Sequence, residues 1–125
     1  MTPHFFTPSE ANRRLPYIKK VVADILAKGK EGKALRLMPY PTPTMKQKIE
    51  ELDAQIKVLL LELEAIGCSF KDWNFEIGLV DFPTVINGRE MLLCWRCDEK
   101  EVAWFHGHDD GYSNRQRITS EMIFS

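Results

Sequence analysis

The chain has 125 residues, a length that fits one domain able to fold without a disulfide or a structural metal. Its hydrophobic fraction of 44% and its charged fraction of 28% are those of an ordinary globular protein. The net charge of -1 argues against a protein that works on nucleic acid, because such proteins usually carry a strongly basic domain.

Charge is unevenly distributed along the chain. Residues 1–50 hold ten Lys and Arg against four Asp and Glu, a balance of +6, and residues 51–125 hold seven against fourteen, a balance of -7. We interpret this asymmetry as two halves that face each other, within one chain or across a dimer. An electrostatic surface for another partner is the alternative interpretation.

The sequence carries no sign of a targeting or membrane segment. Residues 1–6 lack the basic start and the apolar run of a secretory signal, and no apolar run approaches the ~20 residues of a membrane span. The three cysteines are an odd number, whereas disulfide frameworks use even numbers. Together these features predict a protein of the reducing cytoplasm with no membrane partner.

The first predicted helix spans residues 7–28. Thr7 and Glu10 have the spacing of a capping box at its start. Apolar residues then recur at spacings of 4, 3, 4 and 3 and define one helix face: Ala11, Leu15, Ile18, Val22 and Ile25. This spacing predicts an amphipathic helix that packs on the rest of the domain.

Proline and glycine residues set the expected limits of this helix. Pro16 lacks a backbone donor and is expected to kink the helix near its first turns. Gly29 and Gly32 are expected to close it. Residues 30–44 then form the only linker, which alternating prolines keep extended, and we do not interpret it as a domain boundary.

The second predicted helix, residues 44–66, is the clearest element. Thr44 and Gln47 form another capping box, and Gly67 ends the helix. Its apolar residues form a heptad seam of the coiled-coil type: Met45, Ile49, Leu52, Ile56, Leu59, Leu63 and Ile66. Pairing with the first helix of the same chain explains the seam, and pairing across a homodimer is the alternative.

From residue 78 the apolar period changes to two, which predicts a three-stranded antiparallel meander over residues 78–108. Asn87-Gly88 is the signal of a type I′ hairpin turn. The predicted strands are Leu79–Ile86, Arg89–Cys97 and Val102–His108, and a polar tail follows over residues 112–125. The fold class is therefore α+β, with an antiparallel two-helix hairpin packed on a three-stranded antiparallel sheet.

The hairpin turn decides which residues share a face of the sheet, with the third strand in register if Cys97 lies opposite Glu101. One face is almost wholly apolar and must pack on the helices: Val80, Phe82, Thr84, Met91, Leu93, Trp95, Ala103 and Phe105. The other face mixes apolar and ionisable groups: Leu79, Asp81, Pro83, Val85, Glu90, Leu92, Cys94, Arg96, Val102, Trp104, His106 and His108. A solvated face does not carry so many large apolar groups, so this second face is either an interface or a pocket wall.

Two short motifs on this second face resemble metal sites. Cys94 and Cys97 form a C-x-x-C motif, but on a strand they point to opposite faces, which argues against zinc at this pair. His106 and His108 share a face, so they could chelate one zinc-like metal ion, with Asp81, Asp109 or Asp110 completing the set. The alternative is that the first histidine packs in the sheet and the second is solvated.

A second kind of chemistry uses Asp81, Cys94 and His106 together. A thiol near a histidine and a carboxylate is typical of nucleophilic catalysis. However, His106 is expected to lie diagonal to Cys94, and the sequence identifies no oxyanion hole. The alternative is a buried thiol beside an aspartate that pairs with Arg96 or Arg115.

A set of short motifs resembles a known family. They are Phe6-Thr7, Glu10-Ala11-Asn12, Leu15-Pro16, Gly78-Leu79-Val80-Asp81-Phe82-Pro83, Gly88-Arg89-Glu90, Leu93-Cys94-Trp95, Trp104-Phe105-His106, Asp110-Gly111-Tyr112 and Arg115. Over about residues 5–117 they resemble domain of unknown function 2203, a family of small bacterial proteins. The family has no assigned activity, so the resemblance implies a bacterial cytoplasmic protein and no more. It includes the candidate cluster Asp81, Cys94, His106, Asp110 and Arg115, but not Cys97 or His108.

Two functional hypotheses follow. The first is a cytoplasmic, non-enzymatic interaction protein without a cofactor or a nucleic-acid partner, homodimeric through the helical seam, the mixed sheet face or both. It predicts that the mixed face is covered by another chain or by the tail. The second is an enzyme or a small-ligand or metal-binding protein with an open site around Asp81, Cys94, Trp104, His106, Asp110 and Arg115. It predicts that His106 contacts Asp81 or Asp110.

Overall fold

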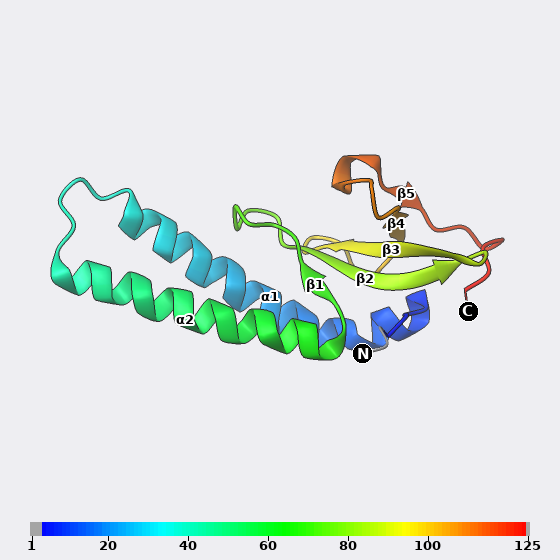
Figure 1. The fold of residues 1–125 in the computed structure, drawn as a ribbon, viewed down its shortest axis with the longest axis horizontal. Helices are drawn as coiled ribbons and strands as arrows, with labels where there is room; N and C mark the ends of the chain where they lie inside the picture. Colours follow the sequence, from blue (N-terminus) through cyan, green and yellow to red (C-terminus); the bar gives the residue numbers. More distant parts are fainter. Residues whose placement is uncertain (1–3, 125) are drawn as a thin grey trace.

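The computed structural model describes residues 4–124. Two helices lie on one side of a five-stranded antiparallel sheet whose strands follow the chain order (Figure 1). The elements are α1 (Pro8–Arg36), α2 (Pro43–Ile66), β1 (Ser69–Phe70), β2 (Leu79–Ile86), β3 (Arg89–Arg96), β4 (Trp104–His106), a 3-10 turn (Tyr112–Asn114) and β5 (Gln116–Arg117). The predicted α+β class is confirmed, and two short edge strands extend the predicted three-stranded sheet.

Helix α1 begins as predicted and ends later than predicted. Thr7 caps it, because its hydroxyl oxygen accepts the Glu10 N–H at 3.1 Å. The helix continues through Pro16 and past Gly29 to Arg36, so the predicted end at residue 28 is wrong. Gly29 serves packing instead, because the Phe75 ring occupies the space that a Cβ would need. The kink at Pro16 stays a prediction.

The cap of helix α2 lies two residues earlier than the predicted capping box. Thr42 is the cap, and its hydroxyl oxygen accepts the Met45 N–H at 3.1 Å, so the prediction of Thr44 as the cap is wrong. Pro43 explains the shift, because proline suits the first helical position and loses no hydrogen bond there. Gly67 ends the helix as predicted, with a φ of 111° in the left-handed region.

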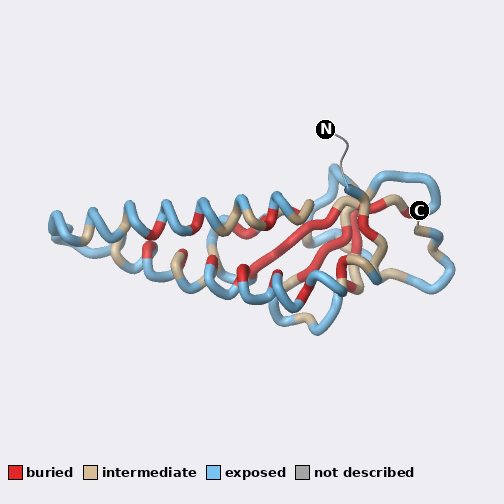
Figure 2. Tube along the Cα trace, turned by 90° about the horizontal axis from the view of Figure 1, so that it is seen from below, coloured by how far each residue is buried: buried red, intermediate tan, exposed pale blue. Residues whose placement is uncertain are grey.

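The heptad seam of α2 packs within the chain, against α1. Each of its positions is buried or half-buried: Met45, Ile49, Leu52, Ile56, Leu59, Leu63 and Ile66. Figure 2 shows buried residues where the helices meet each other and the sheet, whereas the part of the hairpin that extends beyond the sheet is mostly exposed. The seam therefore pairs with the first helix of the same chain, which is the first of the two interpretations of this pattern.

The central strands have the predicted register. Asp81 of β2 lies opposite Cys94 of β3, and Leu93 of β3 lies opposite Phe105 of β4. The inner face of the sheet builds the core with α1 and α2 through buried side chains: Val80, Phe82, Thr84, Leu93, Trp95 and Phe105. The outer face is consequently left for the mixed set of apolar and ionisable residues.

The third predicted strand is shorter than expected. Strand β4 covers three residues rather than the whole of 102–108, because α1 holds the segment before it: the Val102 N–H donates to Asn12 Oδ1 at 2.7 Å. Val102 is buried in the core cluster with the helices. Its predicted place on the outer face is therefore wrong, since strand alternation does not extend back to this residue.

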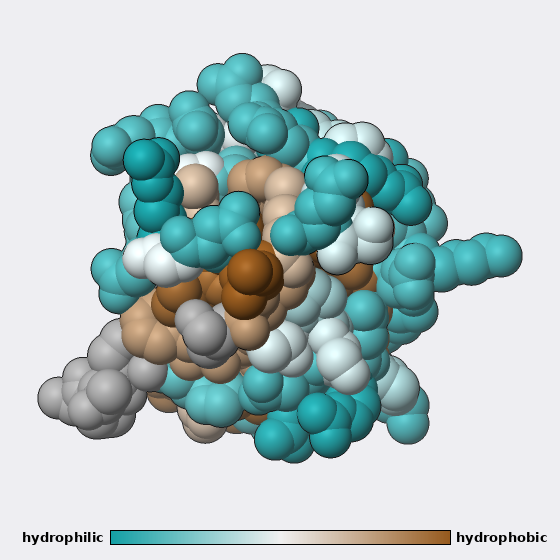
Figure 3. All heavy atoms as spheres, turned by 90° about the vertical axis from the view of Figure 1, so that its right-hand side faces the viewer, coloured by the Kyte–Doolittle hydropathy of each residue, from teal (hydrophilic) through white to brown (hydrophobic). Residues whose placement is uncertain are grey.

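The C-terminal tail docks along the sheet. Residues 116–117 form β5, and Phe124 bridges to Ile86 at the end of β2. Nearby, the Ile123 N–H donates to Asn87 Oδ1 at 3.0 Å. Figure 3, which views the molecule from this end, shows a small apolar area in a largely hydrophilic surface. The end of the tail thus covers the tip of the β2–β3 hairpin, and its start lies on the outer face, where Arg115 packs over Trp104.

Ion pairs within the chain join its basic first part to its acidic second part. Arg36 pairs with Asp53 at 2.6 Å, and Lys33 pairs with Glu76 at 3.7 Å, so basic residues of the first fifty contact acidic residues of the remainder.

Within the described chain, none of the helices combines the length and the apolar character that crossing a membrane requires.

Candidate functional site

Three neighbouring strands bring three ionisable side chains together on the outer face of the sheet. Asp81 lies on β2, Cys94 on β3 and His106 on β4. Cys94 pairs directly with Asp81, and His106 pairs with Leu92, so the histidine is diagonal to the thiol as predicted. All three residues are at most 5% exposed. The alternation of the strands therefore builds a buried polar cluster.

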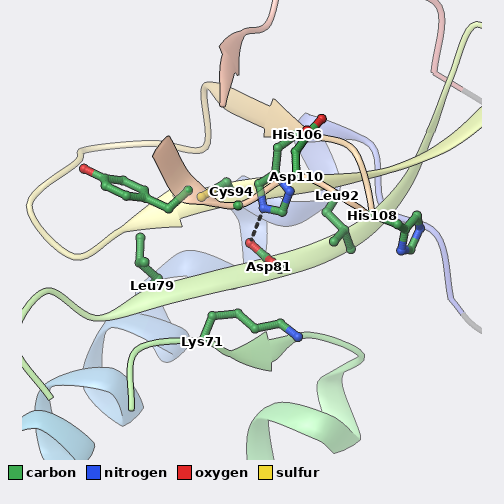
Figure 4. A pocket seen from close by; sticks show the side chains of 10 residues that line it. Lys71, Leu79, Asp81, Leu92, Cys94, His106, His108 and Asp110 are labelled. Carbon is green, nitrogen blue, oxygen red and sulfur yellow. Dashed lines mark hydrogen bonds and ion pairs between the residues drawn. The ribbon is translucent and has the colours of Figure 1, made fainter. Parts of the chain in front are cut away.

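Within this cluster, Asp81 and His106 contact each other directly. His106 Nε2 lies 3.1 Å from Asp81 Oδ1, and His106 Nδ1 lies 2.8 Å from the Gly107 carbonyl oxygen (Figure 4). Because a carbonyl oxygen only accepts, Nδ1 carries a hydrogen and donates it. The other nitrogen of the ring is thereby directed at Asp81. This is one of the two contacts that the ligand-site hypothesis requires.

Burial decides the protonation behaviour of the cluster. Burial raises the pKa of the Asp81 carboxyl above its ordinary value, although His106 and Lys71 nearby act in the opposite direction. Burial also raises the pKa of the Cys94 thiol to about 11, and the charge of Asp81 adds to this effect. Because the thiolate is the nucleophilic form, this pKa argues against Cys94 as a nucleophile near neutral pH.

Arg115 lies beside the cluster in a fixed position. Its guanidinium forms a bidentate pair with Glu99, with distances of 2.9 and 2.5 Å. It also lies over the rings of Trp104 and Tyr112, at 4.6 and 4.8 Å from their centroids. Its Nη1 is 4.0 Å from Cys94 Sγ. The guanidinium therefore supplies positive charge next to the thiol.

The predicted pairing of Asp81 with Arg96 or Arg115 is wrong. Arg96 Nε pairs with Asp98 Oδ1 at 2.5 Å, and Arg115 pairs with Glu99. Sequence reasoning missed Glu99 because the turn after β3 gives no periodic signal. Only the fold brings this turn next to the segment that follows the 3-10 turn.

A hollow of about 290 Å³ lies over the cluster. The cluster forms its floor, and Figure 4 shows the surrounding side chains. Its walls combine apolar and polar groups, which are Lys71, Leu79, Leu92 and Tyr112. Over this part of the sheet, the mixed face therefore lines a hollow.

Comparison with known proteins identifies the family. The family model described as "Uncharacterized conserved protein (DUF2203)" matches residues 4–118. The chain belongs to this family. The match includes every residue that lines the hollow. No curated protein and no solved structure matches the chain.

The structure places the remaining candidate residues of this DUF2203 chain at the edge of the hollow. His108 and Asp110 are exposed lining residues, so His108 does not join His106 and Asp81 as a predicted metal ligand. The reason is local: the Asp110 N–H donates to the Gly107 carbonyl at 3.1 Å, so the chain turns directly after β4. Strand periodicity, on which the prediction rested, ends there.

Cys94 takes the place that was predicted for His108. The potential ligand atoms of Asp81, Cys94 and His106 all lie within 4.8 Å of one another. Cys97, the other half of the C-x-x-C motif, is exposed and lines a separate hollow, so the two thiols do not act together. The motif is thus two unrelated cysteines, as the alternation of strand faces predicted.

Sequence reasoning missed two residues of the pocket wall. Lys71 directly follows β1, a strand of two residues that is too short to show a period. Tyr112 lies in the 3-10 turn, where its hydroxyl oxygen accepts a hydrogen bond from Arg96 Nη1. For Tyr112 a signal existed, because it belongs to the Asp110-Gly111-Tyr112 motif of the family resemblance.

Proposed function

We propose that this protein binds a small molecule in the pocket on the outer face of its sheet. The observation that carries the proposal is the buried Asp81–His106 pair at the floor of an open hollow. Burying two ionisable groups is costly, and ionisable groups buried in a cleft are typical of binding and catalytic sites. The proposal corresponds to the second sequence hypothesis, an enzyme or ligand-binding protein.

A second hollow of similar size supports the choice by contrast. It has a volume of about 310 Å³ and is lined by His4, Glu10, Arg13 and Arg14. These side chains are all polar, and His4 is 56% exposed. Small-molecule sites are mostly apolar with a few placed polar groups. The outer-face pocket combines apolar side chains such as Leu79 and Leu92 with its polar groups, whereas polar side chains alone line the second hollow.

The wall of the pocket indicates a class of ligand. Lys71 is exposed and brings positive charge to one side, Asp110 brings negative charge to the rim, and the Asp81–His106 pair offers hydrogen-bonding groups at the floor. Tyr112 adds an aromatic surface. A compact molecule with an anionic carboxylate or phosphate and one polar group fits this distribution, and the volume of about 290 Å³ suits a molecule of that size.

The test is a thermal-shift screen of carboxylate- and phosphate-containing metabolites. At least one compound should raise the Tm of the wild-type chain and should lose this effect in Lys71→Ala, since the ammonium neutralises the anion. Lys46→Ala, an exposed lysine of α2 far from the pocket, is the matched control and should behave as the wild type. The proposal fails if no compound shifts the Tm, or if both variants respond equally.

A second candidate function, homodimerisation, is favoured by one feature of α2. Its outer surface carries an exposed apolar stripe with spacings of 4, 3 and 4, formed by Ala54, Val58, Leu61 and Ala65. Val58 and Leu61 are 57% and 52% exposed. In an antiparallel pair of α2 helices this stripe would pack on its copy, with Lys57 of one chain near Glu64 of the other.

Sedimentation velocity tests this candidate. Val58→Asp should convert a dimer to a monomer, because it places a charge in the stripe, whereas Lys46→Ala should leave the dimer intact. A wild-type chain that sediments as a monomer, or a dimer that persists in Val58→Asp, contradicts pairing through α2.

A cytoplasmic location is part of the proposal. Cys68, Cys94 and Cys97 are all free thiols, and Cys68 and Cys94 are buried apart from any other cysteine. Free thiols of this kind persist in a reducing compartment. Quantitative thiol labelling of protein isolated from its native cells should find three reduced cysteines.

A further inference from the structure

We propose that the floor of the pocket is a zinc site formed by Asp81, Cys94 and His106, with a fourth coordination position open to the pocket. The inference deepens the proposed function and rests on it, because it assigns the chemistry of the same site. It starts from the donor set, in which a carboxylate, a thiol and an imidazole converge. These are the three kinds of side chain that bind zinc in proteins.

The distances suit a single ion. The potential ligand atoms lie within 4.8 Å of one another, and the closest pair, His106 Nε2 and Asp81 Oδ1, is 3.1 Å apart. Around a tetrahedral zinc with bonds of about 2.0–2.3 Å, ligand atoms lie roughly 3–4 Å apart. The ion would replace the direct His106–Asp81 hydrogen bond, and only small side-chain movements would be required.

The orientation of His106 is a second, independent observation. Its Nδ1 donates to the Gly107 carbonyl at 2.8 Å, so Nε2 is the ring nitrogen directed at the cluster. Histidines that bind metals characteristically donate their other ring N–H to a carbonyl or a carboxylate, which fixes the tautomer. The Gly107 carbonyl, in the turn after β4, therefore holds the His106 ring in the orientation that a metal ligand needs.

Arg115 provides the matching support for the thiol. Its Nη1 lies 4.0 Å from Cys94 Sγ, and Glu99 and the Trp104 ring hold the guanidinium in this place. Zinc binds the thiolate, so binding transfers the proton of Cys94 to solvent. A fixed positive charge beside the sulfur stabilises this thiolate. We therefore assign Arg115 as a positioning residue of the site rather than a ligand.

Three protein ligands with an open position are typical of catalytic rather than structural zinc. The open side of the cluster faces the hollow bounded by Lys71 and Tyr112. A water molecule or an anionic oxygen of the ligand would complete the coordination there, with Lys71 close to the same negative charge. His108, at the rim, lies outside the ligand set (Figure 4).

The test uses the full chain, treated with chelator, dialysed and titrated with Zn²⁺ and with Co²⁺ as a spectroscopic substitute. The wild type should bind one ion, and the cobalt form should show a thiolate charge-transfer band together with the strong visible bands of tetrahedral coordination. Cys94→Ser should abolish the charge-transfer band and lower zinc affinity at least roughly 100-fold, since even outer partners of a site account for 10–100-fold. Arg115→Lys should weaken binding by about tenfold.

The matched control comes from the C-x-x-C motif. Cys97→Ser removes the other cysteine, which lines a separate hollow, and this variant should bind zinc as the wild type does. Circular dichroism of each metal-free variant checks that it is folded. The inference is overturned if the wild type binds no stoichiometric zinc, or if Cys97→Ser removes the charge-transfer band.

The result is separable from that of the metabolite screen. If the wild type binds no zinc in the titration but a metabolite shifts the Tm of the metal-free chain, the zinc site is overturned and the proposed small-molecule site stays intact. One bound zinc with no metabolite response supports the zinc site and contradicts the proposed small-molecule function.

Discussion

Two aspartates, one in the β1–β2 connection and one in β2, are almost equally buried, with Asp72 8% and Asp81 4% exposed. Asp72 follows β1, and its carboxylate accepts four backbone N–H groups at 2.6–3.2 Å, from Asn74, Glu76, Ile77 and Gly78. Asp81, on β2, has His106 as its side-chain partner at 3.1 Å. The first carboxylate is saturated by the loop that it organises, and the second keeps acceptor capacity directed at a pocket.

The pKa values of the two carboxyl groups move in opposite directions. Burial acts to raise the pKa of Asp72, but the four N–H donors outweigh it and lower the pKa below its ordinary value. Burial dominates at Asp81 and raises its pKa. The comparison teaches that burial alone does not identify a site. Asp81 differs because it is a buried carboxyl that is held by one side chain, His106, and that borders a hollow.

The largest expected effect comes from removing the saturated carboxylate. Asp72→Ala should lower the free energy of unfolding by about 2–4 kcal/mol, because four backbone donors lose a charged acceptor. Urea denaturation at neutral pH measures this loss. Asp72→Asn, which keeps one carbonyl oxygen, should lose less. Equal stability of Asp72→Ala and the wild type would break the distinction between the two aspartates.

Acidification should also test the stabilisation by the Asp72 carboxylate, because protonation removes its charge without changing the size of the side chain. The folded pKa of Asp72 lies below its unfolded value of about 3.9, so its stabilisation is complete above about pH 5 and is lost as the pH falls through the folded pKa. We expect the stabilisation by this group to be lost on acidification. Urea denaturation of wild type and Asp72→Asn at several acidic pH values should show a shallower decline in the variant. Parallel declines would contradict the assignment.

A smaller effect is expected at the pocket. In metal-free protein, Asp81→Asn should change the free energy of unfolding by about 1 kcal/mol or less, because the amide can donate to His106 Nε2 and no charge is buried. The same denaturation experiment measures it. A loss as large as that of Asp72→Ala would mean that Asp81 is a structural carboxylate, and the contrast on which the site rests would disappear.

The smallest effect should come from an exposed ion pair of the helical hairpin. Arg36 and Asp53 pair at 2.6 Å with side chains that are 47% and 54% exposed. Arg36→Ala should lower stability by about 0.5 kcal/mol or less, since water and salt screen such pairs. Thermal denaturation at low and high salt checks this, and a loss above about 1 kcal/mol would show that surface charges contribute as much as the buried ones.

Local interactions account for what the sequence by itself determined. The α+β class, the cap at Thr7, the end at Gly67 and the register of β2 and β3 all depend on neighbours in the chain, on a two-residue turn or on apolar periodicity. The same alternation predicted that Asp81, Cys94 and His106 share the outer face. It also predicted that Cys94 and Cys97 point apart.

Contacts between distant segments decided the rest, and no period in the chain encodes them. The Phe75 ring packs against Gly29 in α1, where a Cβ would not fit. The Val102 N–H donates to Asn12, which places Val102 in the core rather than on the outer face. Arg115 pairs with Glu99 and not with Asp81. The edge strands β1 and β5 have two residues each, which is too short for alternation to be read. Only the tertiary structure could show that the mixed face holds a pocket, because a pocket is a property of the space between segments.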